Sequence, residues 1–182
     1  MKKISEIYNN FFKKRLEVPY IKQINENACG AAVLEMVYKY YGLNNIFQNE
    51  IYNKYKEFEP HGSGNTRISV DDIVFDARER NFISFWARAD YNNKENSVNL
   101  LKLLTVNFKI PIIVCQKFSD EEPLMGHFRI VVGVKDNIIY VHDPSMGNGS
   151  AFEKWEIDKF IRFWEPTGEN VKGGIFIIIK KI

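Results

Sequence analysis

The segment CGAAVLEMVYKYYG, residues 29–42, constrains the fold of this chain more than any other part of the sequence. It ends in glycine, the residue that most often follows the last turn of a helix. Apolar side chains cover most of the circumference of the predicted helix: Val33, Leu34, Met36, Val37, Tyr40 and Tyr41. A helix that is apolar on most sides is buried on most sides. We therefore expect a largely buried helix over residues 29–41 at the centre of the domain.

The predicted elements after this helix change from helical to extended along the chain. The first half indicates two further helices, over residues 45–58 and after the pair Asp71 and Asp72, because carboxylates favour the first turn of a helix. The second half indicates strands at 82–88, 110–115, 127–134, 138–142 and 175–182, with helices at 97–108 and 155–164. Helices followed by a mainly antiparallel sheet define an α+β domain.

The overall composition indicates one globular domain. With 182 residues, of which 45% are hydrophobic and 26% charged, the chain can bury a sizeable core and does not resemble a disordered or coiled-coil protein. The 25 Lys and Arg residues nearly balance the 23 Asp and Glu residues, so no nucleic-acid partner is expected. Cys29 and Cys115 form no CxxC pair, which argues against a zinc site and a disulfide framework. We expect neither a metal nor an organic cofactor.

Residues 1–17 are expected to form an extension ahead of the main domain, which then spans residues 18–182. Apolar side chains recur in the extension with helical spacing and predict a short amphipathic helix packed on the core: Ile4, Ile7, Tyr8, Phe11 and Phe12. This pattern lacks the unbroken apolar run of a secretory signal, and no stretch of the chain is long and apolar enough to span a bilayer. The sequence therefore predicts a soluble, cytoplasmic protein.

Cys29 lies where the central helix is expected to begin. The free backbone N–H groups and the positive end of the helix dipole stabilise a thiolate at that point and lower the thiol pKa below its unperturbed value of about 8.5. Gln23 lies six residues before the cysteine, so its side-chain amide can donate to the same carbonyl oxygen as the backbone N–H of Cys29. Cys29 is thus a candidate nucleophile and Gln23 a candidate oxyanion-hole donor.

The predicted hairpin supplies a base and an acid. For a turn centred near Asp136, His127 pairs with about position 145, which makes Asp143 its diagonal neighbour on the same face. A carboxylate there can hold the imidazole in one tautomer while the other ring nitrogen faces the thiol. His142 is adjacent to Asp143 but is expected to point to the opposite face, because side chains alternate along a strand. Cys115 lies in an apolar strand and is expected to be inert core.

The segments that carry these residues resemble one known family. The stretches VPYIKQINENACGAAVLEMVYKYYG, GHFRIVVGVKDNIIYVHDPSMG and FEKWEIDKFIRFW lie within residues 18 to about 165. They resemble the papain-like cysteine peptidases that process the double-glycine leader peptides of bacteriocins. The resemblance implies a papain-like fold in which Cys29 is the nucleophile and His127 the general base. It further implies that Asp143 orients the histidine and that Gln23 donates to the oxyanion.

The resemblance also implies a substrate class and a partner class. The expected substrate is a peptide or protein, cleaved after two glycines in a narrow slot that aromatic residues such as Tyr20, Phe128 and Trp164 could wall. The best-known members of the family are fused to transporters, so association with a transporter or another membrane partner remains open for this chain, which we expect to act as a stand-alone domain. Two alternatives use the same groove: a catalytically silent module that binds leader peptides, and an acyltransferase or amidase with the same triad.

Overall fold

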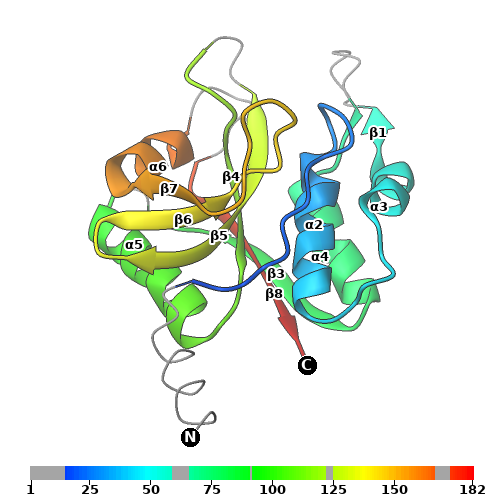
Figure 1. The fold of residues 1–182 in the computed structure, drawn as a ribbon, viewed down its shortest axis with the longest axis horizontal. Coiled ribbons are helices and arrows are strands. Elements are labelled where there is room, and N and C mark those ends of the chain that lie inside the picture. The colour runs from blue at the N-terminus through cyan, green and yellow to red at the C-terminus, as the bar shows by residue number, and fades with distance from the viewer. Residues whose placement is uncertain (1–14, 59–65, 91, 122–124, 167–172) are drawn as a thin grey trace, which may run out of the picture.

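The computed structural model describes residues 15–58, 66–90, 92–121, 125–166 and 173–182, which form a helical part and a sheet part (Figure 1). The helical part contains α2 (Cys29–Tyr40), α3 (Gln48–Tyr55), α4 (Val70–Glu79) and a small sheet of β1 (Glu57–Phe58) and β2 (Thr66–Arg67). The large sheet is antiparallel in the order β3-β8-β4-β5-β6-β7. Its strands are β3 (Phe82–Arg88), β4 (Ile112–Lys117), β5 (Gly126–Lys135), β6 (Ile138–His142), β7 (Glu153–Glu156) and β8 (Ile175–Lys181). The predicted α+β class is confirmed.

Helices cover both faces of the large sheet (Figure 1). The α2 and α4 helices pack on one face, and α5 (Lys94–Lys102) and α6 (Ile157–Trp164) pack on the other. The β5 strand contributes to both cores, with Phe128, Ile130 and Val132 on the α2 side and Val131 and Val134 on the α6 side. A strand buried on both faces has no solvent-facing positions, which explains the nearly continuous apolar run in its sequence.

The central helix begins and ends close to the predicted residues. It begins at Cys29 and ends at Tyr40, and its residues 29–38 are buried, as its all-round apolar pattern predicts. Gly42 follows with a φ of 90°, a left-handed conformation that glycine adopts without strain. The α4 helix begins after Ser69, whose hydroxyl accepts from the backbone N–H of Asp72 while the Asp72 carboxylate accepts from the N–H of Ser69.

Three other predicted helices differ from the structure at their ends. The helix predicted over residues 45–58 is shorter, and the one predicted over 97–108 starts earlier and passes into a π-helical turn at Leu103–Asn107. The start of the helix predicted over 155–164 is wrong, because residues 153–156 form β7 on the edge of the sheet. Its apolar residue, Trp155, alternates with charged neighbours over too short a length for the pattern to distinguish strand from helix.

A buried carboxylate joins the helices of the helical part. Asp76 on α4 is fully buried and accepts hydrogen bonds from the Tyr38 hydroxyl at 2.6 Å and from the Arg80 guanidinium at 2.8 Å. Burial raises the pKa of Asp76, but its hydrogen bonds to Arg80 and Tyr38 outweigh that effect and hold the pKa below its usual value. The stabilisation that Asp76 contributes is therefore present above the unfolded-state pKa of about 3.9 and is lost as the pH falls through the lower, folded-state value.

We expect Asp76→Ala to lower the free energy of unfolding by about 2–3 kcal/mol at neutral pH, because the buried Tyr38 hydroxyl loses its acceptor. Urea denaturation at pH 7 measures the loss, and on acidification to below about pH 3 the variant should lose less stability than the parent. Asp158→Ala is the matched control: Asp158 forms an exposed ion pair with Lys94, and its loss should cost less than about 1 kcal/mol. Equal effects of the two substitutions would contradict this assignment.

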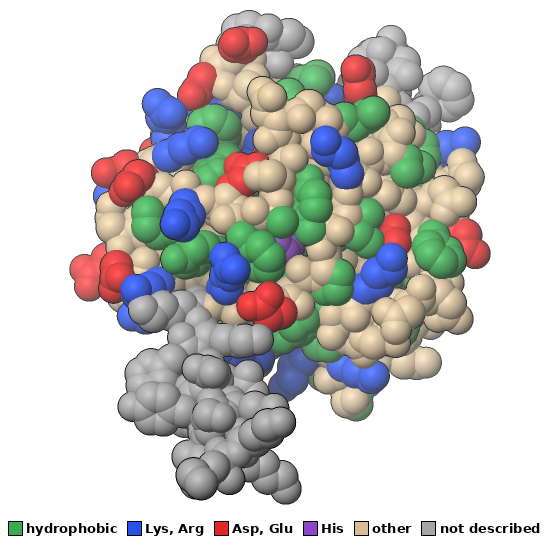
Figure 2. All heavy atoms as spheres, viewed as in Figure 1, with side chains coloured by type: hydrophobic (Ala, Val, Ile, Leu, Met, Phe, Trp, Pro, Cys, Tyr) green, Lys and Arg blue, Asp and Glu red, His purple; other side chains and the backbone are tan. Residues whose placement is uncertain are grey.

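Two further findings concern the ends and the surface of the chain. Residues 1–14, and with them most of the predicted N-terminal extension, lie outside the described residues. Charged side chains of both signs are intermingled over the face in Figure 2, in keeping with the small net charge. Within the ranges that the structure describes, no helix combines the length and the apolar character needed to cross a membrane.

Candidate active site

The first turn of α2 places Cys29 against the large sheet. Gly30 allows this close approach, because a Cβ at that position would lie 3.2 Å from the Cβ of Ile68 and 3.4 Å from the Phe128 ring. Phe128 lies on β5 directly after His127, so the packing of Gly30 on Phe128 brings the start of the helix beside the start of the strand. Cys29 is buried but still lines an open pocket. The structure thus places the Cys29 thiol at the start of a helix, as the sequence predicts.

The hairpin of β5 and β6 brings His127 and Asp143 together. Ile130 pairs with His142 and Val131 with Val141, which is the register that the sequence predicts on this side of a bulge between Val131 and Gly133. Asp143 follows the last residue of β6, and its Oδ1 lies 2.7 Å from Nε2 of His127. Both side chains are buried. The diagonal placement predicted for these two residues is therefore present.

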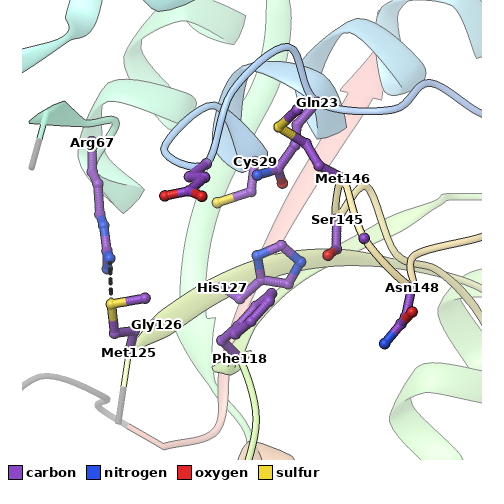
Figure 3. Close-up of a pocket in the computed structure, with 12 residues that line it drawn as sticks. Gln23, Cys29, Arg67, Phe118, Met125, Gly126, His127, Ser145, Met146 and Asn148 are labelled. Carbon is purple, nitrogen blue, oxygen red and sulfur yellow. Dashed lines mark hydrogen bonds between the residues drawn. The ribbon is translucent and has the colours of Figure 1, made fainter. Parts of the chain in front are cut away.

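The imidazole of His127 lies beside the Cys29 thiol (Figure 3), and its Nε2 contacts Asp143. Burial raises the pKa of Cys29, but a hydrogen bond and the charge of His127 more than offset it, so the thiol pKa lies below its ordinary value. Burial likewise lowers the pKa of His127, yet its hydrogen bonds to Asp143 and Cys29 raise the pKa overall. These opposite shifts have one cause, because the thiolate and the imidazolium each stabilise the charged form of the other.

The loop before α2 holds Gln23 beside the cysteine. The backbone N–H of Gln23 donates to the Pro144 carbonyl at 2.9 Å, next to Asp143. On either side of Gln23, the buried Gln48 amide accepts from the N–H of Ile24 at 3.0 Å and donates to the carbonyl of Lys22 at 2.8 Å. These contacts fix the backbone of the loop in three consecutive residues. The side chain of Gln23 therefore projects from a rigid support.

The side-chain amide of Gln23 points toward Cys29 in Figure 3. Its Nε2 donates one N–H to the carbonyl of Asn25 at 2.8 Å, which identifies this atom as the nitrogen because a carbonyl cannot donate. An amide nitrogen carries two N–H groups, so one remains for a ligand. The buried Oε1 has no hydrogen-bond partner among the described residues. Gln23 is thus a buried amide that lines the pocket and has one N–H and its carbonyl oxygen available for a hydrogen bond to a ligand.

Arg129, which the sequence analysis did not single out, anchors the acid. Its Nε donates to Oδ2 of Asp143 at 2.6 Å, on the carboxylate oxygen that His127 does not use. The other guanidinium nitrogens donate to the carbonyls of Lys117 and Phe118 at 3.0 and 2.9 Å. The guanidinium carbon lies 4.9 Å from the centre of the Trp155 ring. Arg129 therefore ties the Asp143 carboxylate to the end of β4.

Several donors converge on Asp143. Its Oδ1 also accepts the backbone N–H of Ser145 at 2.9 Å, and its carbonyl accepts the Tyr20 hydroxyl at 2.9 Å. Burial raises the pKa of Asp143, but His127, Arg129 and the N–H of Ser145 together hold it far below its usual value. Asp143 is therefore ionised at all physiological pH values. A carboxylate in this state accepts the His127 N–H and leaves the other ring nitrogen directed at the thiol.

The second histidine has a different environment. Nε2 of His142 lies 2.9 Å from the Val18 carbonyl, and its Nδ1 accepts the backbone N–H of Phe152 at 2.9 Å. These partners require the proton to be on Nε2, and burial lowers the pKa of this histidine. The prediction that His142 points away from the acid is confirmed.

Cys115 is half-buried in β4, and burial raises its pKa to about 12, so this thiol is protonated.

The pocket between the two parts has a volume of about 380 Å³ and contains the thiol, the imidazole and the Gln23 amide. Its walls include the apolar side chains of Phe118 and Met125 and the loop after β6, which contributes Ser145, Met146, Gly147 and Asn148. The aromatic walls proposed from sequence are not the ones found, because Tyr20, Phe128 and Trp164 do not line it. Trp164 is the fully buried last residue of α6, and Tyr20 contacts the backbone of Asp143 from outside the pocket.

A family model describes most of this chain. The model of the peptidase C39-like family matches residues 15–171, which include all four candidate site residues. The chain belongs to this peptidase C39-like family. A comparison with curated proteins finds no match. Family membership supports a peptidase function, and it agrees with the family resemblance that the sequence motifs indicate.

Solved structures show the same fold. A double-glycine motif protease from an AMS/PCAT transporter, solved with its leader peptide, is 21% identical with a TM-score of 0.62, and the match covers 94% of this chain and 96% of that one. The peptidase domain of Streptococcus ComA, a bifunctional ABC transporter of a quorum-sensing pathway, is 19% identical with a TM-score of 0.63. This match covers 91% of this chain and 100% of that one. A putative C39-like peptidase from Bacillus anthracis is 14% identical with a TM-score of 0.65, and the match covers 91% of this chain and 96% of that one. The predicted papain-like C39 peptidase fold is confirmed.

Proposed function

We propose that this chain is a cysteine peptidase in which Cys29 attacks the scissile peptide bond, His127 transfers protons, Asp143 orients His127 and Gln23 stabilises the oxyanion. The observation that carries the proposal is the buried His127 imidazole, bonded to Asp143 on one side and facing Cys29 on the other, at an open pocket. A structural cysteine has no need of an oriented base beside it. The paired pKa shifts of Cys29 and His127 support a thiolate that exists near neutral pH.

The proposed reaction has two steps. The Cys29 thiolate adds to the substrate carbonyl, and the resulting oxyanion accepts hydrogen bonds from the Cys29 backbone N–H and the free Nε2–H of Gln23. The intermediate then collapses as the His127 imidazolium donates its proton to the leaving amine, which leaves a thioester on Cys29. In the second step His127 takes a proton from water, the hydroxide displaces the sulfur, and the acid and the free thiol are released. No metal or organic cofactor takes part.

We propose a peptide with two glycines before the scissile bond as the substrate. The proposal rests on the fold shared with the double-glycine motif protease that was solved with a leader peptide. Two glycines would suit this site, because Phe118 and Ser145 line the pocket beside His127 and take up space next to the reacting centre (Figure 3). Two of the structural neighbours come from transporters, so a transporter is the partner class that we propose to test first.

Mass spectrometry of peptides incubated with the protein tests the proposed activity. Peptides with an internal Gly-Gly should give two fragments whose masses sum to that of the peptide plus one water, and the Ala-Ala versions should remain intact. A fragment extended by an added amine instead of water would identify an acyltransferase. Binding of the peptide without any fragment would identify a silent leader-binding module, and either result would contradict the proposed hydrolysis.

We expect Gln23→Ala to lower kcat by about 10²–10³-fold with little change in KM, because the amide donates to an oxyanion that exists only after attack. Steady-state kinetics on a cleaved Gly-Gly peptide measure both constants. Ile24→Ala serves as the control, since this neighbouring side chain is exposed and outside the pocket lining. A change confined to KM would show that Gln23 binds the substrate and does not stabilise the oxyanion.

A further inference from the structure

A positive charge lies in the wall of the pocket opposite the loop after β6. Arg67 ends β2 in the helical part and extends along the pocket toward Met125 at the start of the sheet part (Figure 3). Its Nη2 lies 3.0 Å from the Met125 sulfur. Arg67 thus bridges the two sides of the pocket in which Cys29 and His127 lie.

Among the residues that the structure describes, the Met125 sulfur is the one acceptor found for the Arg67 guanidinium. A thioether sulfur is a weak acceptor, whereas a guanidinium presents five N–H donors in a planar fork that matches a carboxylate. Within the described part of the chain Arg67 forms no ion pair, in contrast to Arg129 and Arg80, which each bind a buried carboxylate. Arg67 is half-buried, so its charge is only partly screened by water. A cation in this state attracts an anionic ligand.

The charge of Arg67 acts at the reacting centre. Arg67 and Cys29 line the same pocket, and the guanidinium charge adds to the larger effect of His127 in lowering the pKa of Cys29. Met125 and Phe118 line the same pocket with apolar side chains. Glu26, the one carboxylate in the pocket lining, is exposed and forms no ion pair with Arg67 within 4.0 Å among the residues described. Among the described residues no carboxylate therefore pairs with Arg67, which leaves its guanidinium open to an anion carried by a ligand.

We propose that Arg67 forms a subsite for an acidic side chain, Asp or Glu, of the peptide substrate. The proposal rests on the proposed peptidase function and adds a charge requirement to it. An incoming carboxylate would displace the Met125 sulfur and accept two parallel N–H bonds from the guanidinium. Met125 would then pack against the aliphatic part of the acidic side chain. This contact would hold the peptide at one residue near the scissile bond, with the glycines beside Cys29 and His127.

Peptides that differ in one charge test this subsite. In a Gly-Gly peptide, each of the three residues on either side of the glycines is changed in turn to Asp, Asn or Lys, and kcat/KM is measured. At one position Asp should be preferred to Asn by about tenfold or more. Arg67→Gln should remove that preference, and Arg67→Glu should reverse it in favour of Lys. Arg88→Glu is the matched control, because Arg88 is exposed on β3 and outside the pocket lining.

Binding separates this proposal from the proposed reaction. The same labelled peptides are titrated into Cys29→Ala protein, with and without Arg67→Glu, and fluorescence anisotropy gives Kd. Tighter binding of the Asp peptide that reverses in the double variant supports the subsite even if the parent protein cleaves nothing. If Arg67→Gln slows the cleavage of all peptides equally, and no position distinguishes Asp from Asn in binding, Arg67 acts only on the thiolate charge and the subsite is wrong.

Discussion

Cys29→Ala should abolish peptide cleavage while the fold and peptide binding remain. We expect kcat to fall by about 10⁴-fold or more, because the described pocket lining holds no second thiol to form the covalent intermediate. Removal of one sulfur from the first turn of α2 leaves the helix and its packing on the sheet in place. Fragment mass spectrometry measures the cleavage, and circular dichroism together with anisotropy of a labelled peptide measures the fold and the binding.

Cys115→Ala is the matched control for this substitution. The Cys115 side chain is half-buried on β4, outside the pocket lining, and its pKa of about 12 keeps it protonated. We therefore expect the Cys115 variant to cleave at the parent rate. Turnover that persists in Cys29→Ala, or disappears in Cys115→Ala, would show that the nucleophile has been assigned to the wrong residue.

Arg129→Leu is expected to have the largest effect on stability. Asp143 would keep its bonds to His127 and Ser145 but lose its buried countercharge, and the carbonyls of Lys117 and Phe118 would lose their donors. Removing one partner of a buried ion pair costs about 3–5 kcal/mol. Urea denaturation should show a loss of this size. Cleavage should fall as well, because an Asp143 side chain that moves no longer fixes the tautomer of His127.

Two controls separate the roles of Arg129. Arg129→Lys keeps the positive charge but cannot reach the two carbonyls and the carboxylate together, so an intermediate loss of stability is expected. Arg162→Leu removes an exposed arginine that lies over the same Phe163 ring at the same distance of 5.7 Å, and it should cost less than about 1 kcal/mol. If Arg129→Leu is as stable as the parent, the buried network does not hold Asp143.

Local pattern was sufficient to predict the parts of the site that lie on regular elements. The all-round apolar helix placed Cys29 at a helix start, and the period of two along the hairpin placed His127 and Asp143 on one face. Their register was predictable because a short turn fixes the pairing of the strands that it joins. That the helix start and the hairpin meet in space did not follow from spacing, since it depends on the packing of Gly30 against Phe128.

The residues that sequence reasoning missed act through tertiary contacts. Arg129 had a usable signal, because a charged residue within the apolar run FRIVVGV must find a buried partner. Gln48 gave no such signal, since its bonds to the loop around Gln23 depend on how α3 packs beside that loop. The pocket walls at Met125 and Met146 lie outside the helices and strands, where no periodicity indicates which way a side chain points.

The alkylation rate of Cys29 as a function of pH tests the central claim, the charge pairing of thiol and imidazole, most directly. In the parent protein iodoacetamide should modify Cys29 rapidly at pH values well below about 8.5, where an ordinary thiol is protonated. In His127→Ala the midpoint of the rate profile should move to higher pH, because the thiolate loses its partner and remains buried. Identical profiles in the two proteins, both with the midpoint of an ordinary thiol, would contradict the account.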